Sequence, residues 1–102
     1  MAILAIFTGI GISKQQYYNA IKTLDWEKEW PSGMVIHSSG FDDAGNAHAV
    51  DVWTSADALN EYVTKRLVPV MQRLNIPPPK VDIYPAHNIN AHSNVSQFVH
   101  KK

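Results

Sequence analysis

The chain passes from strand to helix at Val50-Asp51-Val52-Trp53-Thr54-Ser55, and the other predicted elements are arranged around this junction. Residues 47–54 are rich in β-branched and aromatic side chains, which favour a strand. Ser55 is a good N-cap because its hydroxyl accepts a hydrogen bond from an amide that the first helical turn leaves unpaired. Asp57 follows in that turn, where its charge suits the positive end of the helix dipole. Apolar residues then recur at helical spacing, which predicts a long amphipathic helix: Leu59, Tyr62, Val63, Leu67, Val70, Met71 and Leu74.

One strand and one helix are predicted ahead of the hairpin that contains this junction. Residues 2–8 are apolar on both faces, which is typical of a strand covered on both sides. Ser13 and Gln16 have the spacing of a capping box, so a helix is expected to begin after Ser13. Its apolar stripe consists of Tyr17, Ile21 and Leu24.

A hairpin and a last strand complete the pattern. Residues 34–41 predict a strand, and the turn-forming residues 42–46 join it to the strand at 47–54. In the long helix, Pro69 removes one backbone donor and is expected to cause a kink. The helix should end at the proline-rich stretch 75–79, and residues 80–84 predict a short final strand.

The resulting order, β-α-β-β-α-β, predicts an α+β fold of the ferredoxin-like type with a four-stranded antiparallel sheet, formed by residues 1–88. The polar stretch 89–102 is expected to be a C-terminal arm or a disordered tail. Two helices cover only one face of such a sheet, yet Val50 and Val52 lie opposite Trp53 on the other face. We therefore expect a homodimer in which the same face of a second copy covers these residues.

Composition narrows the classes of function. The length of 102 residues suits one domain, and the formal net charge of zero argues against nucleic acid or an anionic membrane as the main partner. The absence of cysteine excludes disulfides and a thiolate nucleophile, and it makes the cytoplasm the expected compartment. Residues 1–12 are apolar but lack a basic region and contain two glycines, so we interpret them as a strand and not as a signal peptide.

The element order, the junction Val52-Trp53-Thr54-Ser55 and the late Pro85-Ala86-His87 together resemble the dimeric α/β-barrel superfamily, and more narrowly the antibiotic biosynthesis monooxygenase-like (ABM) domains. The resemblance covers about residues 2–88. It implies that two sheets pair into a barrel and that each subunit keeps a small-molecule cavity between its sheet and helices. Members of this superfamily include cofactor-independent quinone-forming monooxygenases, haem degraders and polyketide cyclases.

The haem-degrading branch fits this sequence poorly. Its strand Trp matches Trp53, but its haem-ligating His on the second helix has no counterpart, because no His occurs between Trp53 and His87. Its Asn on the first strand is also absent from residues 2–8. No cofactor is therefore expected.

His37 and Asp51 form the strongest candidate catalytic pair. If the turn spans 42–46, Phe41 lies opposite Ala47, and the register then places His37 opposite Asp51 and Val35 opposite Trp53. His37, Asp51 and Trp53 would share the face that the resemblance directs toward the cavity. A carboxylate against an imidazole fixes its tautomer and raises its basicity, which suits a general base. A hydrogen-bonded structural pair beneath the helices would satisfy the same pattern.

Three further residues are candidate substrate contacts. Trp53 is expected as a wall of the pocket, although a large aromatic side chain in a small domain is more often core. Tyr84 and His87 lie near the end of the last strand, where either could reach a cavity mouth. His87, His92 and His100 lack the close paired spacing of a helical metal site, so no metal is predicted.

Two functions follow from these observations. One is a small-molecule enzyme acting on an aromatic or polyketide-like compound, as a cofactor-independent monooxygenase or a polyketide-cyclase-like protein, with His37 as base and Asp51 orienting it. The alternative is a non-catalytic dimeric domain for ligand binding or assembly, in which the same pair only satisfies the core.

Overall fold

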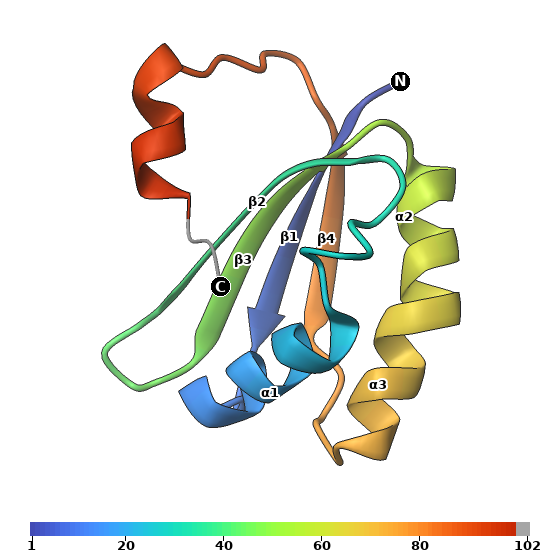
Figure 1. The fold of residues 1–102 in the computed structure, drawn as a ribbon, viewed down its shortest axis with the longest axis vertical. Helices are drawn as coiled ribbons and strands as arrows, with labels where there is room; N and C mark the ends of the chain where they lie inside the picture. Colours follow the sequence, from blue (N-terminus) through green and yellow to red (C-terminus); the bar gives the residue numbers. More distant parts are fainter. Residues whose placement is uncertain (100–102) are drawn as a thin grey trace.

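The sheet is built around its first strand, and the helices lie on one of its faces (Figure 1). The computed structural model describes residues 1–99. The elements are β1 (Ile3–Gly9), α1 (Lys14–Leu24), β2 (Met34–Phe41), β3 (Ala47–Trp53), α2 (Ala56–Tyr62), η1 (Val63–Leu67), α3 (Val68–Arg73), β4 (Lys80–Pro85) and η2 (Ser93–Phe98). The sheet has four strands in the order β2-β3-β1-β4, and every pair is antiparallel. This is the predicted ferredoxin-like α+β fold.

Both predicted helix starts are confirmed by their caps. The amide of Gln16 donates to Ser13 Oγ over 3.1 Å, and the Ser13 amide donates to Gln16 Oε1 over 3.0 Å, which completes a capping box. At the strand-to-helix junction the amide of Ala58 donates to Ser55 Oγ over 3.1 Å. Each cap satisfies an amide that the first turn of its helix leaves unpaired.

The helix after Ser55 is interrupted where Pro69 was expected to disturb it, and the interruption takes the form of the π-helical turn η1. Proline lacks the amide that would donate to the carbonyl of Lys65 in an α-helix, and its ring crowds that carbonyl. The Val68 amide instead reaches back to the carbonyl of Val63. The wider turn lets α2, η1 and α3 continue as one rod along the sheet (Figure 1).

The predicted register of the hairpin is confirmed over most of its length. Phe41 pairs with Ala47, and His37 pairs with Asp51. The expectation that Val35 faces Trp53 was wrong, because a bulge between Met34 and Ile36 places Met34 opposite Trp53. The extra residue of a bulge turns the following side chains to the other face. Met34 is therefore buried in the core and Val35 is exposed.

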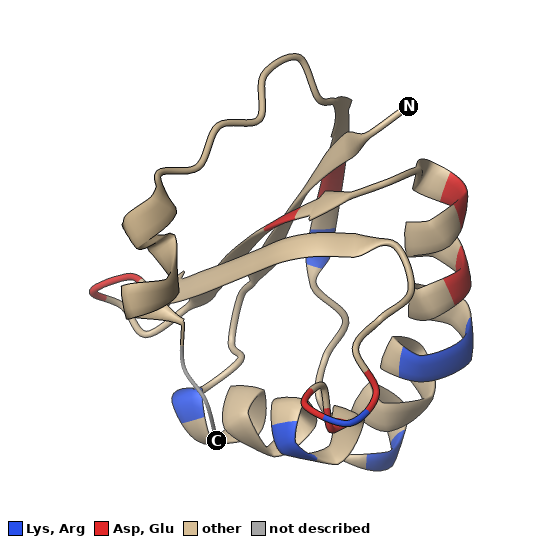
Figure 2. Cartoon of the chain, turned by 45° about the horizontal axis from the view of Figure 1, so that its top comes forward, with Lys and Arg blue, Asp and Glu red and all other residues tan. Residues whose placement is uncertain are grey.

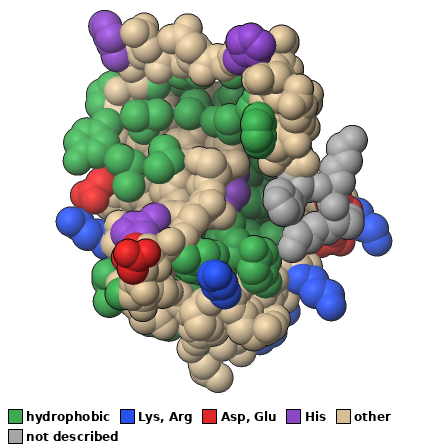
Figure 3. Space-filling view, turned by 90° about the vertical axis from the view of Figure 1, so that its left-hand side faces the viewer, with side chains coloured by type: hydrophobic (Ala, Val, Ile, Leu, Met, Phe, Trp, Pro, Cys, Tyr) green, Lys and Arg blue, Asp and Glu red, His purple; other side chains and the backbone are tan. Residues whose placement is uncertain are grey.

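The two faces of the sheet differ in what covers them. Ile3, Ala5 and Trp53 lie beneath the helices and are buried. The alternate side chains face the other side, where Val52 is buried at 7% exposed but Val50 is 42% exposed and Ile36 is 38% exposed. The chain after β4 leaves the sheet on this second side and forms η2, away from the helices (Figures 1 and 2). Apolar side chains gather on the side of the molecule where this segment lies (Figure 3).

The segment after residue 88 is an extended stretch followed by η2, and residues 89–99 are all exposed. Residues 100–102, which belong to the predicted arm, lie outside the described part of the chain. The division of the chain at residue 88 stays a prediction. Within residues 1–99, no helix combines the length and the apolar character that crossing a membrane requires.

Candidate functional site

A pocket of about 100 Å³ lies between the sheet and the helices. Most of its wall is apolar, with contributions from Phe7, Ile12, Leu24, Leu67, Met71 and Ile76. Residues with polar groups also line it: Tyr17, Trp26, His37, His48, Asp51 and Tyr62. An apolar pocket with a few convergent polar groups is the usual form of a small-molecule site. A second pocket, of about 200 Å³, adjoins it and shares Phe7, Leu67, Met71, Ile76 and Pro79 with it.

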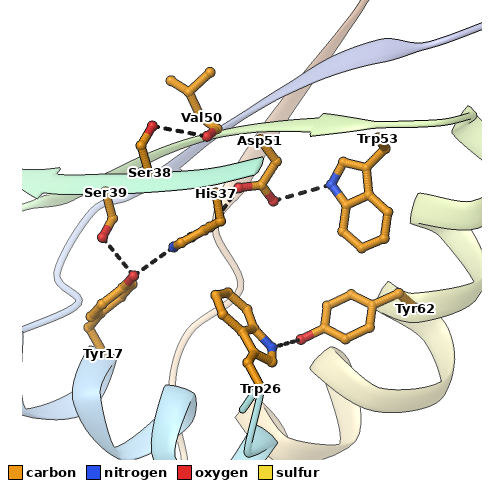
Figure 4. Close-up of polar contacts among 9 residues, drawn as sticks. All are labelled: Tyr17, Trp26, His37, Ser38, Ser39, Val50, Asp51, Trp53 and Tyr62. Atoms are coloured by element: carbon orange, nitrogen blue, oxygen red, sulfur yellow. Dashed lines mark hydrogen bonds and ion pairs between the residues drawn. The ribbon is translucent and has the colours of Figure 1, made fainter. Parts of the chain in front are cut away.

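His37 and Asp51 are in direct contact at this pocket (Figure 4). His37 Nδ1 lies 2.6 Å from Asp51 Oδ1, and the Asp51 residue is only 4% exposed. The second carboxylate oxygen, Oδ2, accepts a hydrogen bond from Trp53 Nε1 over 3.2 Å. A buried carboxylate must have partners for both oxygens, and here the neighbouring strand and its own strand supply them. The predicted contact between the two side chains is confirmed, and their catalytic role stays a prediction.

The partners of His37 determine its tautomer. An ionised carboxylate only accepts hydrogen bonds, so the proton shared with Asp51 is carried by His37 Nδ1. In the neutral ring, Nε2 is then an acceptor, and it lies 2.8 Å from the hydroxyl of Tyr17. Tyr17 therefore donates to His37. The Tyr17 oxygen also lies 2.6 Å from Ser39 Oγ, which is the donor in that contact because the Tyr17 proton is already engaged.

Tyr17 reaches this site from α1, because its position in the apolar stripe of the helix points it at β2. Its ring packs edge-on against Phe41 at a centroid distance of 5.6 Å. Burial raises the pKa of the Tyr17 phenol, the hydrogen bond from Ser39 acts in the opposite direction, and the charge of Asp51 raises it further. Tyr17 is therefore a neutral phenol near neutral pH and a proton donor to His37.

Trp26 and Tyr62 form a second polar contact on the pocket wall (Figure 4). Trp26 Nε1 donates to the Tyr62 hydroxyl over 2.9 Å, and the Trp26 ring lies edge-on to His37 at a centroid distance of 4.6 Å. Burial raises the pKa of Tyr62 to about 12, while the hydrogen bond from Trp26 and the charge of Arg66 act in the opposite direction. The Arg66 guanidinium lies 5.1 Å from the centre of the Tyr62 ring and donates to the carbonyl of Leu24. Tyr62 thus remains a protonated hydroxyl.

The other predicted contact residues lie away from the pocket. Trp53 is fully buried and packs against Tyr62, with ring centroids 5.4 Å apart, so it belongs to the core and does not line the pocket. Tyr84 pairs with Leu4 and therefore points to the face opposite the helices, because residues of β4 on the covered face are its odd-numbered ones. His87 is exposed in the segment that follows β4. The expected placement of Tyr84 and His87 at the mouth of this pocket is not what the structure shows.

Tyr17, Ser39, Trp26 and Tyr62 were not identified as site residues from the sequence. Ser39 had a usable signal, because it lies two residues from His37 on the same strand and thus on the same face. The sequence identifies Tyr17 and Tyr62 only as members of apolar stripes. Their convergence depends on how α1 and α2 dock on the sheet, which residue spacing does not specify.

The remaining histidines have structural partners or lie in the tail. His48 Nε2 lies 2.9 Å from Asp42 Oδ2, and this contact lowers the pKa of Asp42. His92 Nδ1 accepts a hydrogen bond from the amide of Asn94. His100 lies outside the described residues. Within residues 1–99, no three His, Asp or Glu side chains gather closely enough to hold a metal ion.

Comparisons with known proteins identify solved structures that share this fold. No protein-family model matches the sequence, and no match was found among curated proteins. Solved structures do match: SnoaB from Streptomyces nogalater, a cofactor-independent oxygenase, is 12% identical with a TM-score of 0.62, covering 86% of this chain and 94% of that one. A protein from Caulobacter crescentus assigned as an antibiotic biosynthesis monooxygenase is 14% identical with a TM-score of 0.63, covering 85% of this chain and 91% of that one. A conserved protein from Methanosarcina mazei is 15% identical with a TM-score of 0.62, covering 82% and 91%.

These matches confirm the ABM-like fold. The chain has the ferredoxin-like α+β architecture of antibiotic biosynthesis monooxygenase structures, across more than four-fifths of its length. At 12–15% identity the similarity concerns the fold, and the chemistry must be argued from the residues of this pocket.

Proposed function

We propose that this protein is a small-molecule enzyme in which His37, oriented by Asp51, acts as a general base on an aromatic or polyketide-like compound in the pocket. The observation that carries the proposal is the 2.6 Å contact between His37 Nδ1 and Asp51 Oδ1, held in place by the Trp53 indole. It leaves Nε2 as the basic nitrogen and directs it away from Asp51. The contact lies at the edge of an apolar pocket, which is where a general base is useful.

The chemistry begins with removal of an acidic proton from the substrate. The electron pair of the broken C–H or O–H bond stays on the substrate as an enolate or phenolate, and His37 becomes an imidazolium stabilised by the Asp51 carboxylate. Tyr62 is a protonated hydroxyl on the same pocket wall and is available to donate to a substrate oxygen. The apolar remainder of the wall suits a hydrophobic ring system.

Two reactions are open to such an anion. In the oxygenase reaction, which fits the description of SnoaB as a cofactor-independent oxygenase, the anion reacts with O₂, so that a ring methylene and O₂ become a carbonyl and water. In a cyclase-like reaction, the carbanion attacks a carbonyl of the same molecule, a C–C bond forms, and the new alkoxide takes up a proton from solvent. Both begin with the same proton abstraction.

A binding or assembly domain without catalysis is the second candidate. Both ring nitrogens of His37 already have partners within the protein, Asp51 and Tyr17. A pair retained only to satisfy the core would show the same contacts. In this alternative the pocket holds a ligand and the network makes the wall rigid.

We propose in addition that the protein is a homodimer joined through the open face of the sheet, and that it acts in the cytoplasm. The support for the dimer is the exposure of apolar side chains on that face, with Val50, Ile36 and Tyr84 between 38% and 52% exposed. A second copy would bury them in a two-fold interface of roughly 1,200–2,000 Å² in total. The support for the cytoplasm is the absence of cysteine.

The test of the enzymatic proposal is turnover of a panel of phenols, anthrones and linear polyketides by the native protein and by His37→Ala. Oxygen uptake and product mass distinguish oxygenation from cyclisation. We expect His37→Ala to lower turnover by about 10²–10⁴-fold, the usual contribution of a general base. His92→Ala is the matched control, because His92 lies in the exposed segment after β4 and should leave turnover unchanged.

Two results would contradict the proposal. A folded His37→Ala variant with native turnover would exclude His37 as the base. A native protein that binds members of the panel without converting any of them would favour the binding domain.

A further inference from the structure

His37 cannot meet a substrate directly in this structure, because both of its ring nitrogens are occupied. Nδ1 faces Asp51 and Nε2 accepts the hydroxyl proton of Tyr17. If His37 is the base and Tyr17 keeps this position, the substrate proton passes through Tyr17. We infer that Tyr17 is the catalytic residue that exchanges the proton with the substrate, and that Ser39 connects Tyr17 to solvent; this inference rests on the proposed function.

The hydrogen bonds of this network all point in one direction. Ser39 Oγ donates to the Tyr17 oxygen over 2.6 Å, Tyr17 donates to His37 Nε2 over 2.8 Å, and His37 Nδ1 donates to Asp51 over 2.6 Å (Figure 4). Asp51 ends the chain, with Trp53 as its second donor. In this chain of hydrogen bonds the Tyr17 oxygen accepts only from Ser39, so it keeps a lone pair that can accept an incoming proton from the pocket.

Tyr17 is placed to use that position because it lines the pocket and His37 lies directly beyond its hydroxyl. In the transfer, the C–H or O–H bond of the substrate breaks as a new O–H bond forms on Tyr17. The original Tyr17 proton moves at the same time to His37 Nε2. Tyr17 ends as a neutral phenol, His37 as an imidazolium beside Asp51, and the substrate as an anion, so charge and protons balance.

The two proton movements must be coupled. Burial raises the pKa of Tyr17, so a free tyrosinate formed ahead of the substrate would be unfavourable in this environment. A phenol that receives one proton as it releases another avoids that intermediate. This arrangement uses Tyr17 as a carrier and keeps the basic strength in the His37–Asp51 pair.

Ser39 supplies the route by which the network is reset. Its residue is exposed, whereas Asp51 at the other end of the chain is buried. After the substrate anion has reacted, His37 Nε2 gives its proton back to the Tyr17 oxygen while Tyr17 passes the proton that it took from the substrate to Ser39 Oγ, and Ser39 releases its own hydroxyl proton to solvent. The pocket does not have to open for this step.

The competing interpretation is that Tyr17 only holds the His37 ring in place and moves aside when a substrate binds. Tyr17→Phe separates the two, since it retains the ring that packs against Phe41 and removes only the hydroxyl. If His37 takes the substrate proton directly, the Tyr17→Phe variant should keep the native activity or exceed it, because His37 Nε2 is then open to the substrate. If Tyr17 carries the proton, the Tyr17→Phe variant should lose activity.

The experiment measures deuterium incorporation into two aromatic ketones, 2-tetralone and 2-indanone, in D₂O under argon. Loss of the acidic methylene proton signal is followed by ¹H NMR at several ketone concentrations, which separates KM from kcat. For the native protein we expect saturable acceleration over buffer. Tyr17→Phe and His37→Ala should both lower kcat by about 10²-fold or more, with KM for Tyr17→Phe within about twofold of native. Tyr18→Phe, on the exposed neighbour of Tyr17, should match native.

Ser39→Ala tests the solvent end of the chain, because it leaves the Tyr17–His37 contact in place. We expect a lower kcat and an unchanged KM, with a smaller loss than in Tyr17→Phe. A Ser39→Ala variant with native kcat would overturn the role of Ser39.

The remaining outcomes separate a failure of the Tyr17 relay from a failure of the proposed function. If Tyr17→Phe keeps the native rate while His37→Ala loses it, the relay is wrong and His37 remains the base. If the native protein accelerates exchange of neither ketone, the inference and the proposed function are overturned together. Thermal unfolding of each variant confirms that the folded protein is being compared.

Discussion

The two faces of the sheet carry alternate residues of the same strands and yet have opposite surroundings. On β3, Asp51 and Trp53 are almost completely buried beneath the helices, whereas Val50, the neighbour of Asp51 in the chain, is 42% exposed. The Asp51 carboxylate therefore lies on the covered face of the sheet, and the Val50 side chain lies on the open face. Among described residues, Asp51 is the one charged side chain within the buried core.

This difference shows where the sheet buries a charged side chain in place of an apolar one. A buried carboxylate is stable only when it is fully hydrogen-bonded, and Asp51 receives His37 on one oxygen and Trp53 on the other. Within residues 1–99, no comparable network of side-chain hydrogen bonds surrounds the apolar residues of the open face. Asp51 on the covered face thus has its hydrogen-bond partners within the chain, while the open face keeps apolar side chains exposed. Most of the charged residues lie on the helices and loops, away from both (Figure 2).

A charge on the open face should have the largest effect. Val50→Asp would place an unpaired carboxylate in the proposed dimer interface, at a cost of several kcal/mol per ion. The native protein is expected to be a dimer and the variant a monomer at micromolar concentration. Light scattering coupled to size exclusion measures both. A native protein that is monomeric under these conditions would refute the assembly.

Truncation of a buried side chain on the covered face should have the next largest effect. Trp53→Ala removes a fully buried indole and leaves Asp51 Oδ2 without its donor, so the free energy of unfolding should fall by about 3–5 kcal/mol. Chemical denaturation measures the change. Val35→Ala is the matched control on the same sheet, because Val35 is 54% exposed and should lose far less. Equal losses in the two variants would mean that the covered face is not the core.

Asp51→Asn tests the orientation of the network with little change in volume. The Trp53 indole requires an acceptor, so the carbonyl oxygen of the introduced side chain should turn toward it and the NH₂ group toward His37 Nδ1. His37 would then carry its proton on Nε2. The ¹⁵N chemical shifts of the ring report the exchange of tautomer. If Nδ1 stays protonated in the variant, Asp51 does not set the tautomer.

The smallest effect is expected at the helix cap beside this face. Ser55→Ala removes the acceptor for the Ala58 amide and should lower the free energy of unfolding by about 0.5–2 kcal/mol. Ser55→Asn is the matched variant, since it keeps a capping oxygen and should recover most of the loss. A cost for Ser55→Ala above that of Trp53→Ala would reverse the ranking that burial predicts.

The hairpin shows how much of the strand register a local sequence pattern can predict. The turn at 42–46 and strand alternation were enough to predict the pairing of His37 with Asp51, because side chains alternate strictly between faces. The same rule failed a few residues away, where the bulge put Met34 and not Val35 opposite Trp53. No residue in that stretch signals a bulge. It places the larger apolar side chain in the core, which is a property of the packed structure.

The end of the chain shows a second limit. Tyr84 and His87 were expected at a cavity mouth because they are near the end of the last strand. The register of β4 against β1 decides the face on which Tyr84 lies, and in that register Tyr84 pairs with Leu4, which is far away in the chain. The spacing of residues within β4 carries no information about the register of this strand against β1.

The sequence by itself determined the order of elements, the helix caps, the hairpin and the His37–Asp51 contact, since each depends on residues close together in the chain or on strict alternation. Only the tertiary structure decided that Tyr17 from α1 would meet His37 and Ser39 on β2, and that Trp26 and Tyr62 would close the pocket beside them. Those contacts join elements whose relative position is set by side-chain packing, and many helix placements satisfy the same apolar stripe.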